Sequence, residues 1–248
     1  MHEDATQSAA LGPQNAAGAQ ESLVDIAASK RAFLSRIREA LGHQTPPDGL
    51  VAPRPTPPVI DESLVRLCGP EEDLIVPFTR GVLSLGMQVH ETDEHELCNV
   101  LAKLISELAP ATPSSVAVSI ADPLLSRATE QAVRSAGRER CDWRATPGLE
   151  AQYDAAIGIT DVDAGLAETG TIIVRSDALR SRGTFLVPPV HIAIIRARQI
   201  LPDMLDFWKA FRGMPPTSLV FISGPSKTAD IEGILITGVH GPKAVHVV

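Results

Sequence analysis

Short apolar runs rich in β-branched residues alternate with amphipathic helical patterns along the chain beyond residue 70. The expected strands are Ser115 to Ile120, Ala155 to Ile159, Thr171 to Arg175, His191 to Ala197, Leu219 to Ser223 and Ala244 to Val248. The expected helices are Asp73 to Leu85, Glu94 to Leu108, Pro123 to Gly137 and Leu201 to Phe211. Alternation of this kind predicts a mostly parallel sheet with helices on both faces, joined by right-handed crossovers. The predicted fold class is therefore α/β with three layers, α/β/α.

Composition agrees with that architecture. Aromatic residues make up only 4% of the chain, whereas hydrophobic residues make up 44%. The interior must therefore be filled mostly by Ala, Val, Ile and Leu, which suits tightly packed parallel strands and their covering helices.

The first 60 residues have a different character. Residues 1–20 are rich in Ala, Gln and Gly without periodicity, and we expect a disordered tail. The segment Ser22 to Leu41 has apolar residues at helical spacing and ends at Gly42, which predicts an amphipathic arm. Residues 44–60 contain six prolines and are expected to form an extended connector. The main domain is predicted to cover residues 61–248.

The charge and the apolar runs exclude several classes of function. A formal charge of −8 argues against nucleic-acid binding, which needs clustered Lys and Arg. No run approaches the roughly 18 to 20 apolar residues that span a bilayer. The N-terminal residues also lack the basic start and apolar stretch of a signal peptide. We therefore expect a cytoplasmic protein without a membrane span.

Metal and cluster motifs are weak. Cys68, Cys98 and Cys141 lie far apart, so we expect neither a disulfide framework nor an iron–sulfur cluster within this chain. His90-Glu91 with His95 resembles a metalloprotease motif, but the second histidine comes one residue late for one helix face. No metal site is predicted, and the cofactor is left unknown.

The segment Ser223 to Glu232 follows an apolar strand and opens with a glycine. Gly224 permits close backbone approach, Ser226 and Thr228 can cap a following turn, and Lys227 can supply a positive charge. Such a loop can bind a carboxylate or phosphate, although it is not a P-loop. The plainer alternative is a capped loop with a surface lysine.

Three further residues are candidates. Glu168 precedes the strand at Thr171 and could act as nucleophile, base or hydrogen-bond acceptor, or be an ordinary turn residue. His191 follows two prolines near a sheet end and is more often structural. His240 lies between Gly238 and Gly241, where the ring is accessible. We expect these loops to cluster at the carboxyl edge of one parallel sheet, where α/β sheets bind ligands.

Charge also favours the last third of the chain as the ligand-binding region. Residues 161–243 hold nine Lys and Arg against eight Asp and Glu, whereas residues 1–160 hold 13 against 22. We therefore expect a mildly cationic site that receives a small anion.

Four sequence elements together resemble one known family. They are Ala167-Glu168-Thr169-Gly170-Thr171, Leu186-Val187-Pro188-Pro189-Val190-His191, Ser223-Gly224-Pro225-Ser226-Lys227-Thr228-Ala229-Asp230-Ile231-Glu232 and Gly238-Val239-His240-Gly241-Pro242. Their order and spacing look like the LUD domain, the lactate-utilisation protein C family. The resemblance implies a fold similar to the sugar-phosphate isomerase and CoA-transferase group. It also implies a part in converting L-lactate to pyruvate with two partner proteins, one of which carries iron–sulfur clusters.

Three functional readings remain open at this point. The first is the non-iron–sulfur subunit of an L-lactate oxidising complex. The second is an acyl-transferring or sugar-phosphate isomerase-like enzyme that uses Glu168. The third is an assembly or ligand-sensing subunit without chemistry of its own. Glu168 and His240 are the candidate catalytic residues; the candidate ligand-binding residues are Thr169, Gly170, His191, Gly224, Ser226, Lys227, Thr228, Asp230 and Gly241.

Overall fold

The computed structural model divides into two compact units, residues 1–60 and 61–248, which are described separately. It describes residues 28–42, 56, 58–59, 61, 64, 66–69, 73–109, 115–141, 143–144, 150–211, 216–231 and 234–248. In the first unit, residues 28–40 are helical, and Gly42 has a positive φ of 69° just beyond the helix end. The expected tail, the start of the arm and most of the connector lie outside the described residues.

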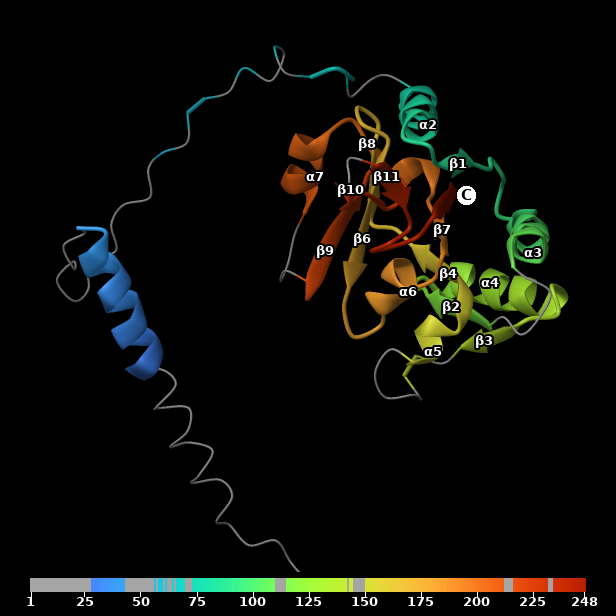
Figure 1. Cartoon of the computed structure of the whole chain (residues 1–248). Coiled ribbons are helices and arrows are strands. Elements are labelled where there is room, and N and C mark those ends of the chain that lie inside the picture. Colours follow the sequence, from blue (N-terminus) through green and yellow to red (C-terminus); the bar gives the residue numbers. More distant parts are fainter. Residues whose placement is uncertain are drawn as a thin grey trace, which may run out of the picture. The chain divides into compact units, whose positions relative to one another are not determined.

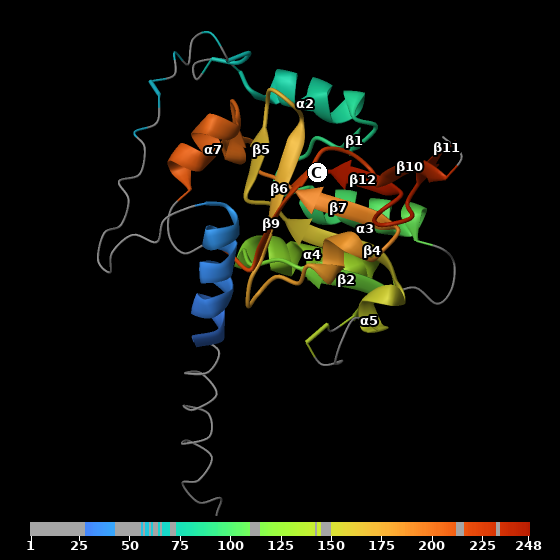
Figure 2. The ribbon, with the colours of Figure 1, turned by 60° about the vertical axis from the view of Figure 1, so that its left-hand side comes forward.

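The second unit is built on a six-stranded sheet in which every neighbouring pair is parallel. The strand order is β1-β12-β7-β4-β2-β3. The strands are β1 (Gln88–Val89), β2 (Ser115–Ser119), β3 (Glu139–Cys141), β4 (Ala155–Asp161), β7 (Val190–Ile194) and β12 (Ala244–Val247). Figure 2 shows β2, β4, β7 and β12 side by side. The predicted α/β class with a mostly parallel sheet is confirmed.

Helices α3 (Leu97–Leu108) and α4 (Pro123–Ser135) cover one face of this sheet. Leu97, Leu101 and Leu104 of α3 recur at helical spacing and are buried against β2, β4 and β7. Helix α4 starts at the expected residue because Asp122 caps it, accepting hydrogen bonds from two backbone N–H groups of the first turn. Sequence pattern and packing therefore agree on this layer.

The opposite face is covered by α2 (Ile75–Ser84), by the short helix α6 (Gly183–Leu186) and by a second sheet. The second sheet has the order β8-β5-β6-β9, and helix α7 (Met204–Ala210) packs on its far side (Figure 1). Its strands are β5 (Ala164–Leu166), β6 (Thr171–Ser176), β8 (Ile200–Leu201) and β9 (Ser218–Ile222). The remaining elements are α5 (Glu150–Tyr153), the 3-10 helix η2 (Ala197–Gln199), β10 (Lys227–Ile231) and β11 (Ile234–Thr237).

The second sheet corrects the expectation of one continuous parallel sheet. The expected strands at Thr171 and Leu219 are β6 and β9, and β6 pairs antiparallel with both β5 and β9. Residues 167–170 join β5 to β6, and a connection this short makes a hairpin because a parallel crossover needs a dozen or more residues. An apolar run predicts a strand but does not specify its sheet.

The segment after Ser226 also differs from the expected loop. Residues 227–231 and 234–237 form an antiparallel pair of strands, the β10–β11 hairpin, which pairs with neither larger sheet in the described residues. Among those residues no helix is both long and apolar enough to cross a membrane.

Candidate functional site

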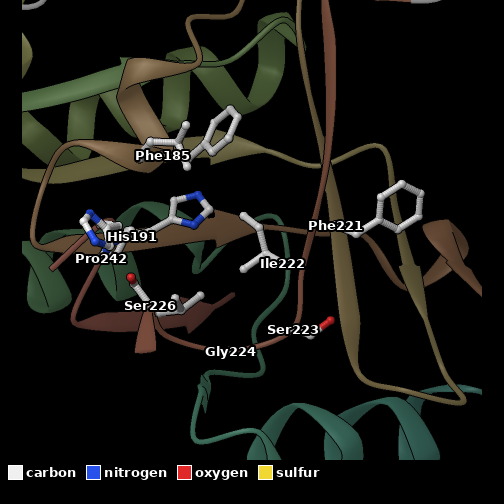
Figure 3. A pocket seen from close by; sticks show the side chains of 12 residues that line it. Phe185, His191, Phe221, Ile222, Ser223, Gly224, Ser226 and Pro242 are labelled. Atoms are coloured by element: carbon white, nitrogen blue, oxygen red, sulfur yellow. The ribbon is translucent and has the colours of Figure 1, made fainter. Parts of the chain in front are cut away.

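Three of the sequence motifs line one cavity of about 220 Å³, which we call the His191 cavity. Figure 3 shows His191 between Phe185 and Ser226, with Gly224 on the loop that leaves β9. The lining residues are Phe185, Leu186, His191, Phe221, Ile222, Ser223, Gly224, Ser226, His240, Gly241, Pro242 and Val245. The predicted residues His191, Gly224, Ser226, His240 and Gly241 therefore share one site.

The cavity lies at the amino ends of β7 and β12, so the expected position at the carboxyl edge is wrong. His191 and Val245 are cross-strand partners near the starts of these strands, and His240 to Pro242 precede β12. The loop after β9 reaches this edge because β9 belongs to the second sheet and is not constrained by the direction of the parallel strands.

Backbone hydrogen bonds hold the two cavity loops together. The Ser226 N–H donates to the Pro242 carbonyl at 2.9 Å, and the Gly238 N–H donates to the Ser226 carbonyl at 2.8 Å. The two loops approach closely at Gly241, since a Cβ there would lie 3.1 Å from the Ser226 Cβ, a tight contact that glycine avoids. The spacing between the Ser226 and His240 motifs thus sets the width of the cavity.

His191 is fully buried in the wall of the cavity. Its Nε2 lies 2.9 Å from the Thr160 hydroxyl, across the β4–β7 pair. Burial lowers the pKa of His191 to about 3, so the imidazole is neutral at physiological pH. Its Nδ1 is buried without a hydrogen-bond partner in the described structure, and buried polar atoms are usually paired. A ligand oxygen in the cavity could satisfy this nitrogen.

A chain of hydroxyl groups connects the Glu168 motif to the cavity. The Thr169 hydroxyl donates to Thr171 at 2.7 Å, and the Thr171 hydroxyl lies 2.8 Å from the Ser223 hydroxyl. Ser223 lines the cavity, whereas Thr169 and Thr171 do not. Thr169 is therefore connected to the cavity lining through Thr171 and Ser223.

The other predicted residues lie outside the lining. Glu168 is partly buried at the β5–β6 turn, where its N–H donates to the Pro202 carbonyl. Gly170 packs against Gly81 of α2 instead of facing a ligand. Lys227 is exposed at the start of β10, and Thr228 and Asp230 follow it in that strand. Among the described residues no Lys or Arg lines the cavity. The expectation of a mildly cationic site, with Lys227 as a positive charge, is therefore wrong for this cavity.

Helix α6 forms the remaining wall of the cavity, and the sequence pattern does not predict this helix. It contributes Phe185 and Leu186, and it packs directly on β4 because Gly158 has no side chain: a Cβ there would lie 1.7 Å from the Thr184 carbonyl oxygen. Gly158 within an apolar strand is the one sequence feature that indicates such close approach.

The site thus combines hydroxyls, one accessible and one buried imidazole, and an apolar wall. Such groups can bind and orient a small acid and can accept or donate a proton at His240. No group of three His, Cys, Asp or Glu side chains in the described ranges is arranged to hold a metal ion.

Comparison with known proteins shows the family of this chain. The model of the LUD domain matches residues 77–248, which include every motif of the cavity. The chain belongs to the LUD domain family. It is 31% identical over 229 residues to lactate utilization protein C of Exiguobacterium sp., covering 86% of this chain and 92% of that protein. It is 27% identical to lactate utilization protein C of Bacillus subtilis, covering 88% and 95%. A solved DUF162 family protein from Deinococcus radiodurans is 18% identical with a TM-score of 0.49, covering 70% of this LUD domain chain and 94% of that chain.

Proposed function

We propose that this LUD domain protein takes part in lactate utilisation as the non-iron–sulfur subunit of a cytoplasmic complex that oxidises L-lactate to pyruvate, and that the His191 cavity receives the hydroxy acid. The observation that carries the proposal is the convergence of the Ser223 and His240 motifs on one small cavity with a buried, unpaired imidazole nitrogen. The names of the relatives in the comparison supply the substrate class.

In this proposal, uncharged groups of the protein bind the carboxylate of the hydroxy acid. The backbone N–H groups of Gly224 and Gly241 donate no hydrogen bond to the described residues, and the Ser226 hydroxyl has no partner there either. Three such donors, together with His191 Nδ1, can satisfy a carboxylate without a lysine or arginine.

His240 is the group assigned to the hydroxyl proton. It is exposed, it lines the cavity, and in the chain it stands between the end of β11 at Thr237 and Gly241. Converting lactate to pyruvate removes two protons and two electrons. The O–H and Cα–H bonds both break in this reaction. His240 accepts the hydroxyl proton, and the partner protein would take the Cα hydrogen with both electrons, which together are one hydride equivalent; its iron–sulfur centres would supply the electron-accepting chemistry. This chain contributes binding, orientation and proton acceptance.

The size of the cavity favours this reading over acyl transfer from a CoA ester. At about 220 Å³ it is smaller than the roughly 300–1,000 Å³ of sites for drug-sized ligands, so it suits an acid of a few carbon atoms. Glu168, the nucleophile of the acyl-transfer reading, is not part of the lining.

A genetic replacement tests the proposal. Cells in which the gene is deleted should lose growth on L-lactate but keep growth on pyruvate. Growth should return with the unmodified protein and with His95→Gln, which alters an exposed histidine outside the cavity lining. His240→Gln, expressed at the same level, should fail to restore it.

Each alternative gives a different result in that experiment. Undiminished growth of the deletion strain on L-lactate contradicts the lactate assignment. Full rescue by His240→Gln supports an assembly or sensing subunit and contradicts the proton-accepting role.

A further inference from the structure

Two adjoining cavities lie at the opposite edge of the parallel sheet from the His191 cavity. One, of about 210 Å³, is mostly apolar and includes Phe78 and Ile200; we call it the ring cavity. The other, of about 380 Å³, has charged residues such as Arg196 and Arg198 at its border; we call it the rim cavity. Both are lined by Thr92, Ile195, Ala197 and Val248, so the two cavities adjoin each other along these four residues.

Their position is the one where α/β sheets most often bind ligands. His90 follows β1, Ile195 follows β7 and Val248 follows β12, so both cavities lie outside the carboxyl ends of three neighbouring parallel strands. The lactate proposal does not use this edge. A ligand here would therefore occupy a separate site.

A histidine pair lies at the wall of the ring cavity. His90 lines that cavity, and its Nε2 lies 3.0 Å from Nδ1 of His246, with the two imidazole planes 17° apart. One N–H must lie between the two nitrogens, whichever ring carries it. This leaves His90 Nδ1 as the nitrogen of that ring that can donate to, or accept from, a ligand.

The charges around the cavities indicate the ligand class. Arg196 is paired with Glu94 at 3.1 Å and with Asp122 at 2.8 Å, so its charge is already balanced. Burial lowers the pKa of both His90 and His246, which favours two neutral imidazoles. The charged side chain in the lining of the ring cavity is that of Glu91, which is exposed to solvent. An anionic group in the ring cavity would lose hydration and would meet no cationic side chain in the lining, whereas the rim cavity is lined by Arg196 and Arg198.

We infer that the ring and rim cavities form one ligand site for a molecule with an uncharged aromatic or alicyclic ring and a polar tail. The ring occupies the apolar compartment around Phe78 and Ile200, and a polar atom on the ring meets His90 Nδ1. The tail extends past Ala197 into the rim cavity, where Arg198 is exposed.

Fluorescence of N-phenyl-1-naphthylamine, an uncharged two-ring probe with one N–H, tests this site in the full chain. The unmodified protein should brighten the probe in a saturable, one-to-one titration. Ala197→Trp, which adds an indole at a residue that lines both cavities, should weaken binding at least tenfold. Ala178→Trp places the same indole at another exposed alanine outside the lining of both cavities, and should leave binding unchanged.

Two further variants keep the test decisive if Ala197→Trp disturbs folding. Thr79→Phe fills the ring cavity from helix α2 and should weaken binding to a similar extent. His90→Phe keeps a ring but removes the nitrogen, and should weaken binding about three- to tenfold, as expected for one hydrogen bond.

Two outcomes would overturn the inference. One is the absence of saturable brightening with the unmodified chain. The other is unchanged binding in folded Ala197→Trp and Thr79→Phe, which would place the probe elsewhere on the protein.

Discussion

His191 Nε2 lies 2.9 Å from the Thr160 hydroxyl, and both side chains are buried where β7 pairs with β4. This hydrogen bond fixes the imidazole in the cavity wall and leaves Nδ1 as the nitrogen available to a ligand. It also links the chemistry of the site to the stability of the parallel sheet, because protonating this ring would place a charge in the core.

The stability of the protein should therefore fall in mild acid. The pKa of His191 is lowered to about 3 in the folded state, whereas the unfolded chain takes up the proton near 6.5. The contribution of the neutral His191 ring to the free energy of unfolding is fully present above pH 6.5. It is lost progressively as the pH falls toward 3. The loss is at most about 1.4 kcal/mol per pH unit.

Denaturant unfolding of the protein and of His191→Phe between pH 7 and pH 4 measures this contribution. The unmodified chain should lose more stability over this range than the variant. Other titrating groups, including His90 and His246, contribute to both proteins and cancel in the difference. Parallel pH profiles would show that His191 is not held neutral by the fold.

Gly170→Ala should strongly destabilise the second unit. Gly170 has a φ of +69°, and a Cβ there would lie 2.2 Å from the Gly81 carbonyl carbon and 2.3 Å from the Val82 nitrogen. Backbone strain and overpacking together should cost about 3 kcal/mol in urea unfolding. Gly137→Ala is the control, since Gly137 has φ +65° but nothing within 4 Å, and should cost about 1 kcal/mol. Equal losses would mean that α2 and the β5–β6 turn are not in close contact.

The hydroxyl chain can be tested by removing its middle member. Thr171→Val should cost about 1 kcal/mol in unfolding free energy, because it removes the buried hydroxyl that bonds to Thr169 and Ser223, two exposed residues that water can then solvate. Thr129→Val removes a hydroxyl that is equally buried but has no partner, and should be neutral or stabilising. A double-mutant cycle with Ser223→Ala should give a coupling energy of about 1 kcal/mol. Zero coupling would contradict the link between the two motifs.

The sequence predicts the layers of this fold better than its sheets. Uninterrupted apolar runs identify β2, β4 and β12, and Asp122-Pro123 identifies the start of α4, because these patterns act locally. The assignment of β6 and β9 to a second sheet depends on the short turn at 167–170 and on long-range pairing, which an apolar run does not encode. The β10–β11 hairpin was missed because Lys227 to Asp230 is polar and resembles a loop.

The candidate site shows the same division. The sequence indicates four residues of the site, because glycine next to a polar side chain is unusual and chemically useful. They are Gly224, Ser226, His240 and Gly241. The apolar wall from Phe185 and Leu186 could not be predicted, since it depends on α6 packing on Gly158. The position of the cavity was also predicted at the wrong edge, because a sequence shows where a loop follows a strand but not which way that strand runs.

Calorimetric titration of L-lactate into the full chain tests the central claim most directly, at concentrations up to about 20 mM so that a Kd of about 1 mM, or about −4.1 kcal/mol, is within reach. We expect saturable one-to-one heat for the unmodified protein and for His95→Gln. With Gly241→Ala, whose new methyl meets Ser226, we expect binding at least tenfold weaker. Absence of saturable heat, or equal binding by Gly241→Ala and the unmodified protein, would contradict a lactate site in the His191 cavity.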